Sequence, residues 1–292
     1  MALPLSLERL KVIGPALMLA LAAVVAPARG VAPASPQSLL LEYEALAAGF
    51  PIVTFAFRLE ETPSAYSLDG RIQAVGAFRL FYRVDVRAES QGDLIHDAAQ
   101  PRWHEHVFTS KGRDRVARLD YPGDGKVSAQ LVPTEDSGRP KPTEQQTVDT
   151  LDPLSAILAM GHRVARAGRC EGTFAVFDGR RRYDITLTDE GGERIDAAPA
   201  YVGPVRRCHA AVRKIAGFSF DHDYQPHTSN GRVWFASPRP GAPALPIRID
   251  FDGTWGLVEV RMTKVAATVD GDQGGSSVLP PSERGALGRS EK

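Results

Sequence analysis

The chain has 292 residues, of which 43% are hydrophobic and 24% charged, and its 35 basic residues balance 35 acidic ones. This composition is that of a packed globular protein, and it excludes wholesale disorder, a collagen-like fibre and a disulfide-dense miniprotein. The total charge shows no basic excess and so argues against a nucleic-acid partner, although it says nothing about local patches.

The N-terminal segment predicts an export signal. Arg9 and Lys11 form a basic flank before an uncharged apolar run over residues 12–25, which is short for a transmembrane helix. Small-residue patterns then place cleavage after Ala28 or after Ala34. We therefore expect residues 1–34 to be a signal peptide, with an uncleaved anchor as the alternative. The mature protein is then expected outside the cytoplasm, without a transmembrane anchor.

Removal of the signal changes the charge balance only slightly. It deletes three basic residues and one acidic residue, which leaves 32 basic against 34 acidic residues and a net charge of −2. A chain this close to neutrality offers no general attraction to nucleic acid or to an anionic membrane.

Short runs of β-branched and aromatic residues, separated by Gly, Pro and Asp, dominate the chain from residue 38 onward. The first two runs, at residues 39–48 and 52–60, flank a Gly-Phe-Pro turn and predict an opening hairpin. Further strands are predicted at residues 81–87, 103–110, 116–121, 127–132, 174–177, 183–188, 208–215, 233–236, 247–251 and 257–262. Their regular spacing predicts a mainly β protein, a single large antiparallel sheet that curls into an open barrel or β-spiral.

One segment of helical periodicity interrupts the strands. Asp152 suits the N-cap, Pro153 the first helical position and Gly168 the stop. Apolar or small residues recur on one face between these signals, at Leu154, Ile157, Leu158 and Gly161. We expect one helix that covers the sheet with this face. The β-rich domain then spans residues 38–267, and the Gly- and Ser-rich residues 268–292 form a disordered tail.

Cys170 and Cys208 are the two cysteines of the chain. An oxidising compartment outside the cytoplasm allows them to form a disulfide. The bridge would close a loop of 39 residues, worth about 3–4 kcal/mol in the chain-entropy model. Two buried free thiols are the alternative.

Two polar groups are candidates for chemistry. His104 and His106 share one face of a predicted strand, but no third ligand is evident, so an ordinary exposed strand is favoured over a metal site. The densest titratable group lies in a loop, at Asp221, His222, Asp223 and His227. It suits a carboxylate–histidine base or a cation, and a polar turn is the favoured alternative. No nucleophile, phosphate-loop or cofactor motif accompanies either group, so no cofactor, metal or catalytic residue is assigned.

Several stretches together resemble an exported family, the domain of unknown function 3108 family, from about Tyr43 to Val260. The resemblance rests on the hairpin around Tyr43, Gly49 and Phe55, on Asp149-Thr-Leu-Asp-Pro-Leu-Ser155, on Val176-Phe-Asp-Gly-Arg180, on Val233-Trp-Phe-Ala236, on Leu245-Pro-Ile-Arg248 and on Gly256-Leu-Val258. It implies a periplasmic β-rich protein and brings no established catalytic residue. More distantly, a curled sheet with one helix is similar to periplasmic lipoprotein carriers, which is an analogy of fold alone.

The sequence therefore favours a non-enzymatic periplasmic protein that maintains the cell envelope by holding a lipid or lipoprotein segment in the concave face of its sheet. The candidate cavity residues are Leu154, Ile157, Leu158, Phe174 and Trp234. One alternative is an envelope hydrolase that uses the loop at residues 221–227. Another is an interaction scaffold with an envelope protein as partner, docked on an edge strand or on the Pro-rich residues 133–146.

Overall fold

A computed structural model describes residues 37–110, 112–134, 139–218, 228–239, 241–253 and 256–268. All of them belong to residues 35–292, one of the two units into which the chain divides. The predicted signal peptide, the predicted tail beyond Thr268 and the loop at residues 221–227 lie outside the described residues. Within the described part, no helix has the length and apolar character needed to cross a membrane.

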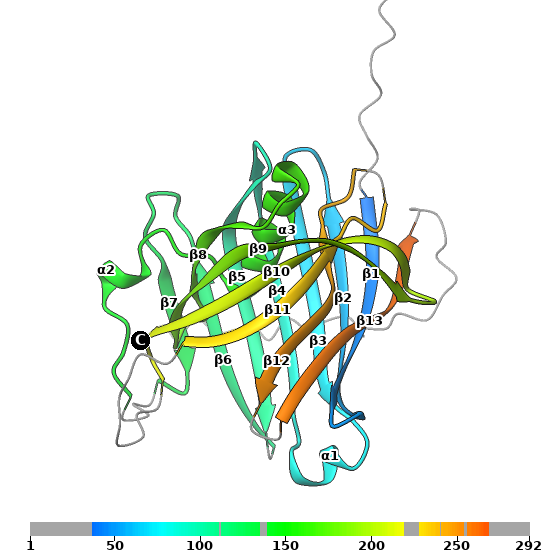
Figure 1. Cartoon of the computed structure of the whole chain (residues 1–292). Helices are drawn as coiled ribbons and strands as arrows, with labels where there is room; N and C mark the ends of the chain where they lie inside the picture. The colour runs from blue at the N-terminus through cyan, green and yellow to red at the C-terminus, as the bar shows by residue number, and fades with distance from the viewer. Residues whose placement is uncertain are drawn as a thin grey trace, which may run out of the picture. The chain divides into compact units, whose positions relative to one another are not determined.

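Thirteen strands form one antiparallel sheet, in the order β7-β6-β5-β4-β3-β2-β1-β13-β12-β11-β10-β9-β8 (Figure 1). The strands are β1 (Gln37–Ala47), β2 (Phe50–Glu61), β3 (Ala65–Ala74), β4 (Asp85–Ile95), β5 (Ala98–Ser110), β6 (Arg113–Asp120), β7 (Ser128–Val132), β8 (Glu171–Phe177), β9 (Arg182–Ala197), β10 (Tyr201–Ala216), β11 (Thr228–Ala236), β12 (Leu245–Gly253) and β13 (Gly256–Thr268). Every neighbouring pair is consecutive in sequence except β1 and β13. The fold is thus two meanders joined where the first strand pairs with the last.

The sheet curls but does not close, because β7 and β8 are its two edges. The gap between these two edge strands, the open seam, is bridged by the turn that follows β8 and by its side chains. Arg180, in the turn after β8, donates to the carbonyl oxygens of Val132 at 3.4 Å and Pro133 at 3.1 Å. On the free edge of β8, the edge not paired with β9, Leu151 forms an isolated parallel bridge with Val176. The predicted open, curled antiparallel sheet is confirmed.

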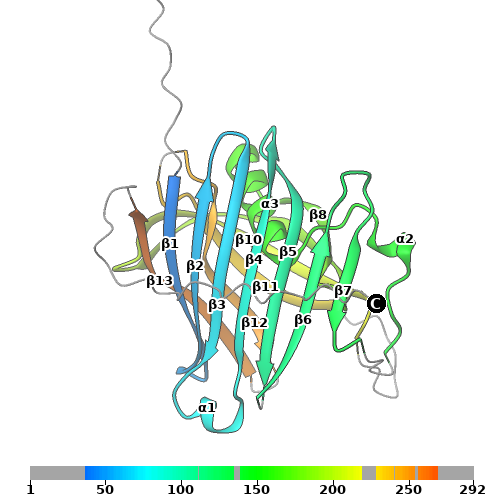
Figure 2. The same ribbon diagram turned by 180° about the vertical axis from the view of Figure 1, so that it is seen from behind.

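Helix α3 (Pro153–Ala167) covers one end of the concave face and packs against β4, β5, β8, β11 and β12 (Figure 2). Its ends form as the sequence predicts. The carboxylate of Asp152 caps the backbone N–H groups of Leu154 and Ser155 at 3.0 Å, and Gly168 ends the helix in the left-handed conformation with φ 64°.

Apolar residues on two sides of α3 divide the interior into two cores. Leu154 and Leu158 join the larger core, which β1, β2, β3, β12 and β13 build. Met160 and Val164 face the smaller core around β8 to β11. The close approach of the helix depends on Gly161, where any Cβ would collide with the carbonyl oxygen of Ala244. Two four-residue helices, α1 (Phe78–Phe81) and α2 (Glu144–Thr147), add to the one helix that the sequence predicts.

Several strands are longer than predicted, most clearly β9 and β10 with 16 residues each. Two predicted positions also need correction. Residues 65–74 form β3, a strand that the sequence pattern does not predict because Asp69 and Gly70 interrupt its apolar alternation. Phe81, predicted to begin a strand, belongs to α1, and β4 begins at Asp85. An apolar run as short as this fits a helical turn and a strand equally well.

Candidate functional site

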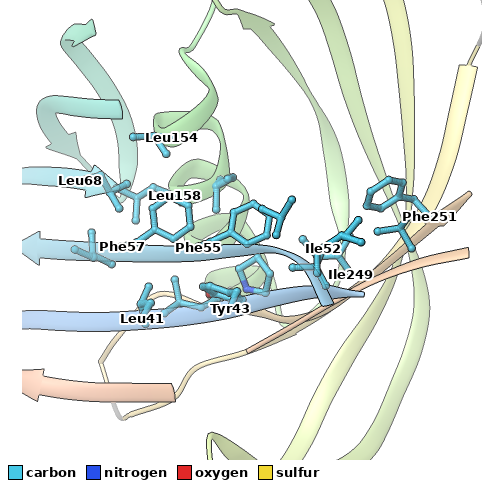
Figure 3. A pocket seen from close by; sticks show the side chains of 18 of the residues that line it. Leu41, Tyr43, Ile52, Phe55, Phe57, Leu68, Leu154, Leu158, Ile249 and Phe251 are labelled. Atoms are coloured by element: carbon cyan, nitrogen blue, oxygen red, sulfur yellow. The ribbon is translucent and has the colours of Figure 1, made fainter. Parts of the chain in front are cut away.

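A cavity of about 590 Å³ occupies the concave face between α3 and the strands β1, β2, β12 and β13 (Figure 3). Its lining is almost wholly aliphatic and aromatic: Leu41, Tyr43, Ala45, Ile52, Val53, Phe55, Phe57, Leu59, Leu68, Leu154, Ile157, Leu158, Leu245, Pro246, Ile249, Phe251, Gly253, Val258 and Val260. The volume falls within the range of about 300–1,000 Å³ that small-molecule sites occupy.

Alternation along the first two strands builds one wall of this cavity. Every second residue of β1, from Leu41 to Ala45, faces the interior. The intervening residues face outward, where Glu42 pairs with Lys264 at 2.9 Å and Glu44 with Arg261 at 3.1 Å. Successive residues of β1 therefore alternate between the apolar cavity wall and the charged outer surface of the sheet.

Phe57 lies over a glycine in the neighbouring strand. Phe57 of β2 is directly opposite Gly70 of β3, and a Cβ on Gly70 would collide with the Phe57 ring. A glycine in a strand interior often marks such a close approach. Gly70 is therefore required for the ring to lie flat on β3 and border the cavity.

Tyr43 supplies the polar side-chain atom of the lining. Its side chain is only 8% exposed, and its hydroxyl makes no hydrogen bond with any described residue. Burial raises the pKa of the phenol, so the group stays neutral and remains a hydrogen-bond donor at ordinary pH.

Three of the five predicted cavity residues, Leu154, Ile157 and Leu158, line the cavity, whereas Phe174 and Trp234 do not. Phe174 belongs to the smaller core. Trp234 lies in the larger core, where its indole N–H donates to Glu193 and its ring lies 5.0 Å from the Arg248 guanidinium. The sequence predicts that an aromatic residue in a strand is buried, but it does not predict which part of the interior the side chain fills.

The rest of the lining comes mainly from the first hairpin and from β12 and β13. Phe55 and Phe57 alternate along β2, and the matching alternation of Tyr43 and Ala45 along β1 gives the signal that could have located them. Ile249 adds a contribution from β12.

Cys170 and Cys208 lie at disulfide distance, with sulfur atoms 1.91 Å apart and Cα atoms 5.6 Å apart. Cys170 lies three residues after the end of α3 at Ala167, and Cys208 lies in β10. The pair therefore links the end of the covering helix to a strand of the smaller core.

A buried polar cluster holds the beginning of α3. The Asp152 carboxylate accepts hydrogen bonds from the Ser90 hydroxyl at 2.7 Å and from the Ser155 hydroxyl, in addition to two backbone N–H groups. Tyr66 extends the cluster through a 2.7 Å hydrogen bond with Ser155. Burial alone would raise the pKa of Asp152, but its interactions with His104 and Ser155 outweigh burial and hold that pKa below its usual value. The carboxylate is thus a fixed negative charge that anchors the helix to β3 and β4.

Ser90, His104 and Asp152 resemble a hydrolase triad in residue type but not in geometry. Nδ1 of His104 lies 2.7 Å from the Ser90 hydroxyl and 3.3 Å from Asp152, so both groups are on the same side of the ring. A triad needs the serine and the carboxylate at opposite ring nitrogens. The other nitrogen of His104 contacts His106 at 3.2 Å instead. The cluster therefore positions α3 and does not activate a nucleophile.

The structure corrects the interpretation of His104 and His106 as part of an exposed strand. His104 is 1% exposed, and both imidazoles face the interior. Burial and the neighbouring His104 lower the pKa of His106 to about 4. Among the described residues, no group of three or more metal-ligand side chains converges. The polar group at Asp221, His222, Asp223 and His227 lies outside the described residues, so it stays a prediction.

The fold and the cavity together define a class, a curled antiparallel β protein with a helix over its concave face and an apolar cavity beneath the helix. The chain belongs to the DUF3108 family of proteins of unknown function, which it matches over residues 41–263. The predicted family resemblance is thus confirmed.

One similar solved structure is a crystal structure of a beta-barrel-like protein of domain of unknown function DUF1849 from Brucella abortus. The similarity has a TM-score of 0.50 at 11% sequence identity, and it covers 80% of this chain and 98% of that chain. At this identity the likeness supports the fold alone. No curated protein matches the sequence.

Proposed function

We propose that this protein is a non-enzymatic periplasmic binding protein that holds one acyl chain of a lipid or of a lipid-modified protein in the cavity beneath α3. The observation behind the proposal is the cavity of about 590 Å³, whose lining of aliphatic and aromatic side chains includes one hydroxyl, that of Tyr43, with no hydrogen bond to a described residue. The export signal that the sequence predicts is the reason for proposing this activity in the periplasm.

The chemistry of the lining favours an apolar chain with a polar end. Each buried methylene group contributes about 0.8 kcal/mol to binding, so an extended hydrocarbon gains steadily from contact with these walls. The neutral Tyr43 hydroxyl is suited to donate to a carboxylate or an ester carbonyl oxygen. A polar ligand would leave its own groups unpaired against the apolar walls, at a cost of about 1–3 kcal/mol each.

Helix α3 forms a fixed wall of this site. Leu154, Ile157 and Leu158 project into the cavity from the turns that follow the Asp152 cap. Because Asp152 is tied to β4 through Ser90, these side chains keep their positions relative to β1 and β2. We therefore expect the site to be largely preformed, which lowers the entropic cost of binding.

Native mass spectrometry of the full-length protein, purified from exported fractions without detergent, tests the proposal. The expected result is a co-purifying lipid that denaturation releases. The variant Ala45→Phe, which places a ring inside the cavity, should abolish this mass increment. Its matched control is Ala56→Phe, the same exchange on the neighbouring strand at a position directed to the outer face, which should retain the lipid.

Recovery of the wild-type protein without any bound lipid, combined with no binding of added fatty acid, would contradict the proposal. Equal lipid content in Ala45→Phe and in the wild type would locate the lipid elsewhere and contradict it as well. The hydrolase alternative depends on residues 221–227 and stays a prediction, and no contact among the described residues favours the scaffold alternative.

A further inference from the structure

Exposed apolar residues gather at the end of the sheet opposite α3. Three segments there form what we call the rim: the β1–β2 turn, the β3–β4 loop at residues 75–84 that contains α1, and the first residues of β13 (Figure 1). The large side chains of the rim are strongly exposed, namely Phe50 at 73%, Leu80 at 80%, Phe81 at 78% and Leu257 at 54%.

Backbone pairing brings the three rim segments together. Ala47 of β1 pairs with Phe50 of β2 on one side and with Val258 of β13 on the other. The β3–β4 loop joins them because the backbone N–H of Val75 donates to the carbonyl oxygen of Ile52 at 3.0 Å. The rim is therefore one continuous surface feature and not three scattered residues.

The rim borders the cavity. Ile52 and Val258 line the cavity and directly adjoin the segments that carry the exposed side chains. Phe251, which also lines the cavity, is 40% exposed and pairs with Val258. Apolar surface thus extends from the cavity lining to the exposed rim.

The charge of the rim adds a second, independent observation. Arg79 and Arg83 flank Leu80 and Phe81 in the β3–β4 loop, and both arginines are exposed. Neither forms an ion pair with a described residue, and no acidic residue lies within residues 75–84. This pattern of aromatic and aliphatic side chains beside unpaired basic groups is the one that proteins use to lie on anionic lipid surfaces.

We propose that the rim docks the protein on the surface of an anionic lipid bilayer, with Phe50, Leu80 and Phe81 inserted among the lipids and with Arg79 and Arg83 on the lipid phosphates. This docking does not depend on what the cavity binds. The near-neutral charge of the whole chain does not reveal this patch. Asp252, opposite Leu257, is an exposed acidic residue beside the rim, and the two arginines exceed it by one charge.

Flotation of the full-length protein with vesicles of phosphatidylglycerol and phosphatidylcholine tests the docking, with vesicles of phosphatidylcholine alone as the comparison. The wild type should float with the anionic vesicles and bind the neutral ones much more weakly. Arg79→Glu/Arg83→Glu should weaken binding to anionic vesicles by at least about 30-fold, the factor that corresponds to a loss of ~1 kcal/mol per arginine. Leu80→Asp/Phe81→Asp should abolish flotation.

Matched controls separate the rim from general surface effects. Arg163→Glu/Arg194→Glu makes the same charge change at exposed arginines outside the rim, and Ile95→Asp/Val202→Asp makes the same apolar-to-acidic change at exposed positions elsewhere. Both controls should float like the wild type, and all variants should keep the wild-type melting temperature because the changed side chains are exposed.

Flotation of the rim variants at the wild-type level would overturn the proposal, as would equal loss in the controls. A dimeric wild type that the rim variants convert to a monomer, with no vesicle binding by either, would show that the rim is a contact between copies and would also overturn it. Fatty-acid binding in vesicle-free solution is measured on the same variants. It is expected to be unchanged, so failure of docking and failure of the proposed ligand binding give different results.

Discussion

The phenol ring of Tyr43 meets the ring of Phe57 edge-on, with centroids 6.1 Å apart and ring planes at 73°. Edge-to-face packing of this kind fixes ring orientation and contributes about 0.5–1.5 kcal/mol beyond the area that the rings bury. Phe57 is in turn held over Gly70. The hydroxyl of Tyr43 therefore occupies a defined position in the cavity wall although no described residue bonds to it.

Replacement of that hydroxyl should change ligand preference without changing the fold. We expect Tyr43→Phe to weaken binding of a fatty acid by about 5- to 10-fold, which corresponds to one hydrogen bond of about 1 kcal/mol or slightly more. Binding of the corresponding hydrocarbon should be unaffected. Calorimetric titration of both ligands measures the difference, and an equal effect on the two would show that the hydroxyl does not contact the polar end.

Gly161→Ala should destabilise the protein, against the direction that helix propensity alone predicts. Alanine is favoured over glycine in a helix by about 1 kcal/mol. The added Cβ would however collide with the Ala244 carbonyl oxygen and push α3 off the sheet. We expect a net loss of about 1–3 kcal/mol in the free energy of unfolding by urea.

The control for this contact is the opposite exchange on the exposed side of the helix, Ala165→Gly. It should cost no more than about 1 kcal/mol, from propensity alone. Stabilisation by Gly161→Ala would mean that the helix does not pack closely on the segment around Ala244.

The partly buried imidazole of His106 should make the free energy of unfolding depend on pH between about 6.5 and 4. In the unfolded chain His106 has its ordinary pKa of about 6.5, whereas burial and His104 lower it to about 4 in the folded protein. The unfolded state therefore binds more protons in this interval, so stability falls as the pH falls. The loss is on the order of 2–3 kcal/mol when the pH reaches about 4.

Urea denaturation at a series of pH values measures this dependence. His106→Asn should flatten the curve between pH 6.5 and 4. His96→Asn, at an exposed turn position with φ 51° that asparagine tolerates, should leave the dependence as in the wild type. Asp152 has a lowered pKa, so its stabilising contribution persists until the pH falls below the ordinary carboxyl value of about 4. An identical pH dependence in wild type and His106→Asn would show that His106 is not buried as described.

Reduction of the Cys170–Cys208 pair should loosen the end of α3. We expect Cys170→Ala/Cys208→Ala to lose about 3–4 kcal/mol, as the chain-entropy model predicts for a loop of this length. A reducing agent should lower the melting temperature of the wild type and leave that of the double variant unchanged. Alkylation of both thiols in the unreduced protein would contradict the pairing.

The strand pattern and the helix ends follow from local sequence, and both could be predicted. The carboxylate of Asp152 and the left-handed Gly168 place the ends of α3 where their residue types indicate, since capping depends on neighbouring backbone groups. Strand β3 could not be found in this way. The need for glycine at position 70 is explained by the ring of Phe57, thirteen positions earlier, which occupies the space that a Cβ would fill. That contact depends on the register of β2 against β3.

An apolar cavity beneath the helix could be predicted from the sequence, but the residues that line it could be predicted only in part. The apolar face of α3 predicts Leu154 and its neighbours as cavity residues, and they line the cavity because a covering helix directs that face inward. Phe174 is equally apolar, but it belongs to the smaller core. Trp234 belongs to the larger core at a position beside Glu193 and Arg248 that does not line the cavity. Local sequence does not indicate which part of the interior a strand residue fills. The His104–His106 pair was misjudged for a related reason, since only the position of Asp152 across the interior explains how these imidazoles are buried.

Binding of saturated fatty acids of increasing length to the delipidated full-length protein tests the central claim most directly. The cavity predicts a dissociation constant that falls about fourfold with each added methylene group, the factor that corresponds to ~0.8 kcal/mol, until the chain fills the available length. Ala45→Phe should end this increase at a shorter chain than Ala56→Phe does. A dissociation constant independent of chain length in the wild type would contradict the claim that the cavity holds an acyl chain.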